Sequence, residues 1–91
     1  MASERQPKVP PELHTVADHC VVAIVRSLNR AGACEPLDRC AVLELVARAL
    51  ESRRDASALA AIDTGVSFAA VGRVLGMSRQ AARRRFEDTS D

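Results

Sequence analysis

The fold is decided by residues 67–86, which read SFAAVGRVLGMSRQAARRRF. Ser67 is a favoured N-cap residue, and the apolar side chains after it recur at spacings of three and four, so they share one face of a helix. These apolar side chains are Phe68, Val71 and Leu75. Gly76 can adopt the left-handed backbone conformation that ends such a helix. The stretch therefore begins with a short helix that stops at Gly76.

A second short helix is predicted directly after this stop, at about residues 78–86. Met77 fills the corner between the two helices, and the Ser78 hydroxyl can accept a hydrogen bond from a backbone N–H two or three residues on. Gly72 lies on the flank of the first helix, where the lack of a side chain would let the second helix approach closely. Polar side chains follow the exposed positions of the second helix: Arg79, Gln80, Arg83 and Arg84. Two helices joined by so short a turn are typical of a helix-turn-helix.

Positive charge is concentrated in the same stretch. The whole chain carries a formal net charge of +1, yet residues 66–86 contain no acidic residue and hold Arg73, Arg79, Arg83, Arg84 and Arg85. A basic module on a nearly neutral body suits a polyanion such as DNA, because each neutralised phosphate releases condensed counterions. The last five residues, 87–91, are acidic in balance, and we expect this tail either to turn away from the duplex or to stay mobile. The alternative interpretation is a charged helix end that only faces solvent.

Residues 67–86 resemble the helix-turn-helix of many small transcription regulators, and most closely a version common in actinobacterial DNA-binding proteins. The matching positions are Ser67, Phe68, Ala69, Gly72, Arg73, Leu75, Gly76, Ser78, Arg79, Gln80, Ala81 and Ala82. The resemblance implies binding to double-stranded DNA. By this resemblance the bases would be read by Arg79, Gln80 and Arg84, and the phosphates would be contacted by Ser78, Arg73 and Arg83.

One position departs from that pattern. Near the end of the second helix, where an apolar residue is usual, the chain has Arg85 followed by Phe86. Phe86 lies four residues after Ala82 and can replace the missing anchor, because residues four apart share a helix face. We therefore expect Phe86 to hold the end of this helix, with a shift in how the helix end sits.

The rest of the chain predicts an all-α fold of about five helices. The further helices are expected at residues 11–30, 36–53 and 55–62, the last of them capped by Asp55. The alternative is that residues 53–55 simply continue the helix at 36–53, which would reduce the number of separate helices. The predicted organisation is a flexible arm at 1–10, a helical pair at 11–54, a helix-turn-helix unit at 55–87 and an acidic tail at 88–91. Arg5 and Lys8 would allow the arm to enter a minor groove, although a disordered arm without a role is the simpler interpretation.

The helices at 11–30 and 36–53 carry more apolar surface than a chain of 91 residues can easily cover from within. The first has an apolar stripe that runs for over four turns, and the second is apolar around most of its circumference. The stripe consists of Leu13, Val16, Ala17, Cys20, Val21, Ile24, Val25 and Leu28. We therefore expect these two helices to form the interface of a homodimer. An internal core is the alternative.

Other classes of protein find little support in the sequence. The start of the chain lacks an apolar stretch after a basic one, and the longest apolar run is too short to cross a bilayer, so we expect a cytoplasmic protein at the nucleoid. The three cysteines, Cys20, Cys34 and Cys40, are expected to be reduced and buried. These cysteines could form a metal site together with His14 and His19, but the sequence contains no C-x-x-C pair. It also contains neither a phosphate-binding loop nor a nucleophile motif that would indicate an enzyme. No cofactor is expected.

The sequence thus predicts a sequence-specific DNA-binding protein, either a transcriptional regulator or a nucleoid-associated factor, that reads the major groove with the helix at about 78–86. The rival hypothesis is a protein-interaction module on the same scaffold, which binds another regulator or a sigma factor with little or no DNA contact. In that case the binding energy would come from Val42, Leu45 and Val46, and the arginines would be dispensable.

Overall fold

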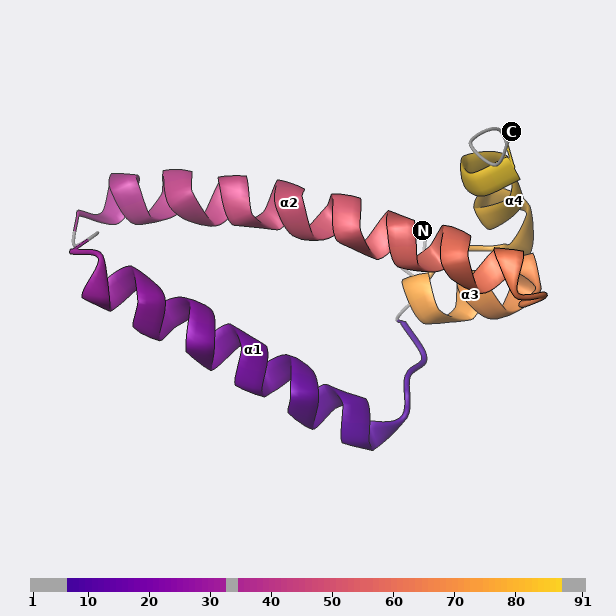
Figure 1. Ribbon diagram of the computed structural model, residues 1–91, viewed down its shortest axis with the longest axis horizontal. Coiled ribbons are helices and arrows are strands. Elements are labelled where there is room, and N and C mark those ends of the chain that lie inside the picture. Colours follow the sequence, from indigo (N-terminus) through magenta and orange to yellow (C-terminus); the bar gives the residue numbers. More distant parts are fainter. Residues whose placement is uncertain (1–6, 33–34, 88–91) are drawn as a thin grey trace, which may run out of the picture. The chain divides into compact units, whose positions relative to one another are not determined.

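The computed structural model describes residues 7–32 and 35–87, which fold into helices without any strand (Figure 1). The helices are α1 (Pro11–Arg30), α2 (Pro36–Asp63), α3 (Phe68–Leu75) and α4 (Arg79–Glu87). The all-α class is therefore confirmed. The chain divides into two compact units, the α3–α4 unit (Met1–Val9 with Arg53–Asp91) and the α1 unit (Pro10–Ser52).

The described residues hold four helices, so the predicted count of about five is too high. The helices expected at 36–53 and 55–62 are one continuous helix, α2, of 28 residues. Residues 53–57 contain neither glycine nor proline, and nothing there interrupts the hydrogen bonds of a helix. Asp55 does not cap a new helix, because its carboxylate binds Arg54 and Arg85 instead. The helix ends only before Gly65, which has a φ of 101°.

The α1 unit buries little of its apolar surface. Helix α1 has its predicted bounds, with proline in its first turn, but Leu28 is the only buried side chain that the structure describes between residues 10 and 52. The exposed large apolar side chains are Leu13, Val16, Val21, Val22 and Val25 on α1, and Leu37, Leu43, Leu45 and Leu50 on α2. At the connection between the helices the Arg39 guanidinium donates to Asn29 Oδ1 at 3.1 Å. Across residues 7–32 and 35–87, no helix is both long and apolar enough to cross a bilayer.

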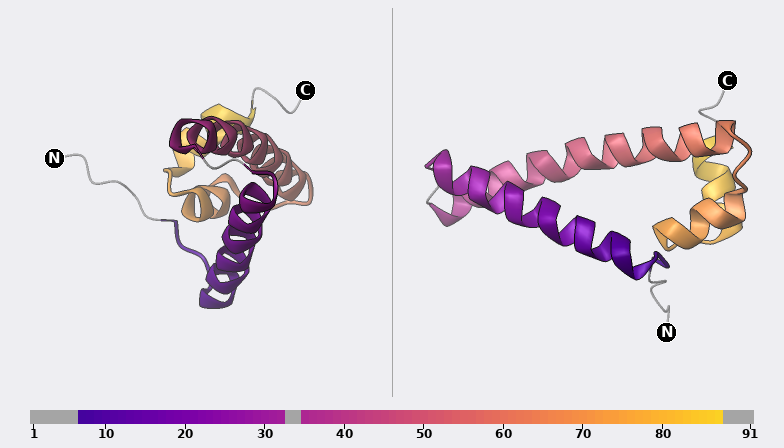
Figure 2. Two further views of the ribbon diagram at one scale, coloured as in Figure 1. Left: turned by 90° about the vertical axis from the view of Figure 1, so that its left-hand side faces the viewer. Right: turned by 60° about the horizontal axis from the view of Figure 1, so that its bottom comes forward.

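The core of the α3–α4 unit draws on three helices. Ala58 of α2, Val71 of α3 and Ala82 and Phe86 of α4 are buried together, and Phe86 is only 2% exposed. Partly buried side chains complete this core: Leu59, Ile62, Phe68, Leu75 and Met77. Figure 2 shows α3 and α4 beside the last turns of α2. Phe86 is therefore an anchor of the end of α4, as its spacing from Ala82 predicts.

The α3 helix and the turn after it have the predicted local chemistry. The Ser67 hydroxyl accepts a hydrogen bond from the Ala70 N–H at 3.1 Å, and Gly76 has the left-handed φ of 73°. Gly72 is buried, and a Cβ atom built there would lie 2.6 Å from the backbone oxygen of Met77. The same Cβ would also lie 3.1 Å from the backbone oxygen of Ser78, the residue that caps α4, so the turn and the start of the second helix both require a glycine at this position.

Candidate nucleic-acid interface

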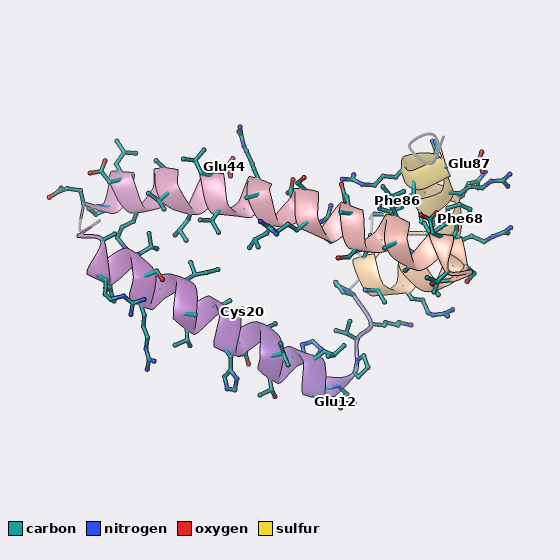
Figure 3. All side chains as sticks on the ribbon, in the orientation of Figure 1. Glu12, Cys20, Glu44, Phe68, Phe86 and Glu87 are labelled. Atoms are coloured by element: carbon teal, nitrogen blue, oxygen red, sulfur yellow. The ribbon has the colours of Figure 1, made fainter. Side chains whose placement is uncertain are left out.

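The α4 helix is fixed at both ends. At its start, the Ser78 hydroxyl accepts a hydrogen bond from the Ala81 N–H at 3.0 Å, which satisfies one of the free donors of the first turn. At its end, Phe86 is buried in the core, and Figure 3 labels it close to Phe68. Because Ala82 is fully buried as well, one side of α4 is committed to the core. The polar side chains therefore face outward.

Four of the predicted site residues surround one hollow at the start of α4. This α4 hollow has a volume of about 480 Å³ and is lined by Ser78, Arg79, Gln80 and Arg83. Arg79, Gln80 and Arg83 are exposed, and no acidic side chain lines the hollow. The structure thus brings together two positions assigned to base reading and two assigned to phosphate contact.

Arg73 and Arg84 lie outside this hollow. Arg73 is exposed on α3, where it lines a second, neighbouring hollow of about 460 Å³ that also includes Arg79. Arg84 is exposed on α4 but lines neither hollow. It follows Gln80 by four residues and so shares its helix face further along. Of the six predicted residues, Arg84 is the least well integrated into the group.

Glu87 is an acidic residue on the basic helix, and its position differs from our expectation. We expected it to belong to the acidic tail, but it is the last residue of α4, and Figure 3 labels it there; residues 88–91 lie outside the described residues. Its carboxylate accepts a hydrogen bond from Arg83 Nε at 2.6 Å and raises the pKa of Arg83. The i, i+4 spacing of an arginine and a glutamate is the sequence signal that could have revealed this pair.

Arg85 is committed to the fold rather than to the outward face of α4. It donates to Asp55 Oδ2 on α2 at 2.9 Å, and Arg54 donates to the other oxygen of the same carboxylate at 3.0 Å. The hydrogen bond from Arg85 is the main cause that lowers the pKa of Asp55, and partial burial opposes it. The Arg85 guanidinium also lies over the Phe86 ring, 5.9 Å from its centre. Arg85 and Phe86 therefore hold the end of α4 against the fold. They stand at the position where the sequence departs from the helix-turn-helix pattern.

The cysteines and histidines do not assemble a site in the described residues. Cys20 and Cys40 are exposed free thiols, so the expectation that they are buried is wrong. They lie on helix surfaces that the α1 unit leaves uncovered, which the sequence pattern alone does not reveal. Cys34 lies outside the described residues. Within residues 7–32 and 35–87, no three His, Cys, Asp or Glu side chains are grouped so that they could hold a metal ion.

Comparison with protein-family models, with curated proteins and with solved structures finds no match for this chain. The likeness of residues 67–86 to small helix-turn-helix regulators therefore stays a prediction from the sequence. The function has to be inferred from the charge, the caps and the packing of α3 and α4.

Proposed function

We propose that this protein binds double-stranded DNA through α4 and acts as a transcriptional regulator or a nucleoid-associated factor in the cytoplasm. One observation carries the proposal: Ser78, Arg79, Gln80 and Arg83 line one hollow at the start of a helix whose opposite side is held in a core. A short helix with a rigid back and a basic, amide-bearing front has the chemistry needed to enter a major groove. The α3 helix would brace the pair against the DNA backbone.

The side chains divide into two roles under this proposal. Arg73, Arg83 and the capped start of α4 at Ser78 would contact phosphates, which position the protein without reading sequence. Arg79 would form a two-pronged hydrogen bond with guanine, and Gln80 would do the same with adenine. Arg84 remains a further candidate for base reading at the far end of the same face.

The proposal includes a homodimer formed through α1 and the first part of α2. Val21 is 58% exposed and Leu45 is 67% exposed, and seven further large apolar side chains of these segments are also exposed. Burial of a Val or Leu side chain stabilises by about 1.5–3 kcal/mol, so an apolar face of this kind favours association. A symmetric dimer would present two α4 helices about 34 Å apart, one DNA turn, to a nearly palindromic site.

A protein-interaction module remains the second candidate, because the α1 unit offers a specific apolar surface. A hollow of about 380 Å³ on this unit is lined by Ala23, Ile24, Ser27, Leu28, Ala31, Val42 and Val46. Val42 and Val46 belong to the group that the sequence assigns to partner binding, whereas Leu45 lies outside this hollow. Another regulator or a sigma factor could supply the apolar side chains that fill it.

The deciding experiment is a fluorescence-anisotropy titration with random-sequence duplex and genomic fragments at two salt concentrations. Arg79→Ala should weaken binding to a preferred fragment by about 1 to 3 kcal/mol and relax its selectivity, whereas Arg83→Ala should weaken all duplexes alike and reduce the salt dependence. Arg26→Ala, which removes an exposed charge from α1, is the matched control and should leave selectivity unchanged. Absence of binding by the wild type at low salt would contradict the proposal and favour the interaction module.

A further inference from the structure

The chain just before α1 is attached to α3. The backbone N–H of Lys8 donates to the carbonyl oxygen of Arg73 at 2.9 Å. Arg73 lies in the last turn of α3, where helix carbonyls lack a partner within the helix. The bond therefore satisfies a free acceptor. It also fixes the position from which the Lys8 side chain extends. Both residues belong to the α3–α4 unit.

Lys8 completes a cationic cleft between three segments of the chain. This arm cleft is the second hollow described above, with a volume of about 460 Å³, and it is lined by Lys8, Ala69, Gly72, Arg73, Gly76, Met77 and Arg79. Three of these residues are cations, and none is acidic. They come from the N-terminal segment, from α3 and from the start of α4, while the small residues between them keep the cleft open. Three like charges around one open space repel one another, and an anion bound among them would offset this repulsion.

We propose that the arm cleft binds one backbone phosphate of duplex DNA, with Lys8 as a phosphate contact in addition to Arg73, while Arg79 borders the cleft and keeps its proposed role in base reading. The inference rests on the proposed DNA-binding function and adds a residue and a location to it. An arginine offers a planar fork of donors to the phosphate oxygens, and a lysine adds a mobile point charge, so Arg73 and Lys8 together suit a tetrahedral oxyanion. Under this proposal Lys8 is held beside α3 and contacts the sugar-phosphate backbone of the DNA. The alternative indicated by the sequence is a flexible arm that enters the minor groove.

The variant Lys8→Gln tests the assignment cleanly. The bond to Arg73 is made by the backbone N–H, which any residue except proline retains, so the substitution removes the charge and leaves the anchor. Lys8→Arg keeps the charge and should keep the wild-type behaviour. Arg26→Gln removes one exposed positive charge from the α1 unit and serves as the matched control for net charge.

The measurement is the slope of log affinity against log salt for a random-sequence duplex between 50 and 200 mM KCl. Loss of one phosphate contact should reduce the magnitude of the slope by about 0.9, so the affinity ratio of wild type to Lys8→Gln should shrink about 3.5-fold over this range. Arg26→Gln should keep the wild-type slope. Sequence preference should be the same in all variants, because a phosphate contact carries no base information.

The outcomes separate this inference from the function on which it rests. If the wild type does not bind duplex at 50 mM KCl, the DNA-binding function fails and the inference fails with it. The cleft does not hold a DNA phosphate if the wild type binds duplex and Lys8→Gln keeps the same salt slope. The same conclusion follows if Arg26→Gln reduces the salt slope as much as Lys8→Gln does. In both cases the wider function stands. A rise in melting temperature with inorganic phosphate that Lys8→Gln abolishes, with an unchanged DNA slope, would overturn the inference in favour of a free phosphate ligand.

Discussion

Glu87 is the residue whose removal should have the clearest effect on DNA binding. Its carboxylate holds Arg83 and adds a negative charge to the outward face of α4. Glu87→Gln should release the guanidinium for phosphate contact and tighten binding to every duplex about 3- to 10-fold at low salt. The anisotropy titration measures this directly. Asp63→Asn, the same change of charge at the exposed end of α2, is the control and should have a smaller effect. Unchanged affinity in Glu87→Gln would show that Arg83 makes no phosphate contact.

Asp55 should contribute stability that depends on pH. Its pKa is lowered by the hydrogen bond from Arg85, so the carboxylate stabilises the folded state above the ordinary Asp pKa of about 3.9, and this stabilisation is lost as the pH falls through the lowered value. Asp55→Asn should reduce the free energy of unfolding at pH 7 by about 0.2–1 kcal/mol, the range for surface ion pairs. Urea denaturation at several pH values measures the difference.

The difference between wild type and Asp55→Asn should shrink in acid, since both carry a neutral side chain there. Glu44→Gln breaks the exposed i, i+4 pair with Arg48 on α2 and provides the comparison. It should cost less, because both side chains are more than half exposed, at 73% and 58%. Equal costs for the two variants would mean that the Arg85 contact between α4 and α2 adds nothing to the fold.

The turn between α3 and α4 is the element most sensitive to a small change. Gly72→Ala should destabilise the α3–α4 unit by about 1–3 kcal/mol, because its Cβ would lie 2.6 Å from the backbone oxygen of Met77. Gly65→Ala is a useful contrast, since its Cβ would meet no atom within 4 Å and the cost is only that of a φ of 101°. Thermal unfolding followed by circular dichroism compares them. If Gly72→Ala is no worse than Gly65→Ala, the turn must relax freely.

The elements that the sequence predicts well are those with local chemistry at their ends. Ser67 and Ser78 accept capping hydrogen bonds, and Gly76 adopts a positive φ, because the signals for these features lie within a few residues. The break expected before Asp55 failed because a favoured N-cap residue also serves inside a helix when its carboxylate finds partners 1 and 30 residues away. The partner of Arg85 is set by packing of α4 against α2, which no local pattern encodes.

The candidate site shows the same division. Side chains that one short helix carries, such as Arg79, Gln80 and Arg83, could be grouped from their spacing alone, and they line one hollow. Lys8 could not be assigned to that region, because it lies 65 positions before Arg73 in the sequence and is joined to it by a backbone hydrogen bond. The exposure of Cys20 and Cys40 was missed because apolar periodicity indicates which face would be buried but not what covers it.

For the molecule as a whole, the uncovered apolar face of the α1 unit leads to a prediction about assembly. The double variant Val21→Glu and Leu45→Glu should convert the proposed dimer to a monomer that keeps its helices, since both side chains are largely exposed and neither belongs to the core. Sedimentation velocity gives the mass and circular dichroism gives the helix content. Affinity for a two-half-site duplex should fall more than affinity for a single half-site.

Val66→Glu is the control for this assembly prediction, because Val66 is also exposed, at 40%, but lies between α2 and α3 in the other unit. In sedimentation velocity Val66→Glu should have the same assembly mass as the wild type. A wild-type protein that sediments as a monomer at micromolar concentration would contradict the homodimer, and the apolar face would then be available for a different protein partner.

The aromatic content of the core has a practical spectroscopic consequence. The chain has no Trp or Tyr and only two Phe, and both of them, Phe68 and Phe86, pack in the α3–α4 unit. Protein labelled with fluorophenylalanine should therefore give just two fluorine resonances, and both would report on the unit that we propose to contact DNA. Shifts on addition of duplex would monitor that unit alone, because α1 contains no phenylalanine and would carry no fluorine label.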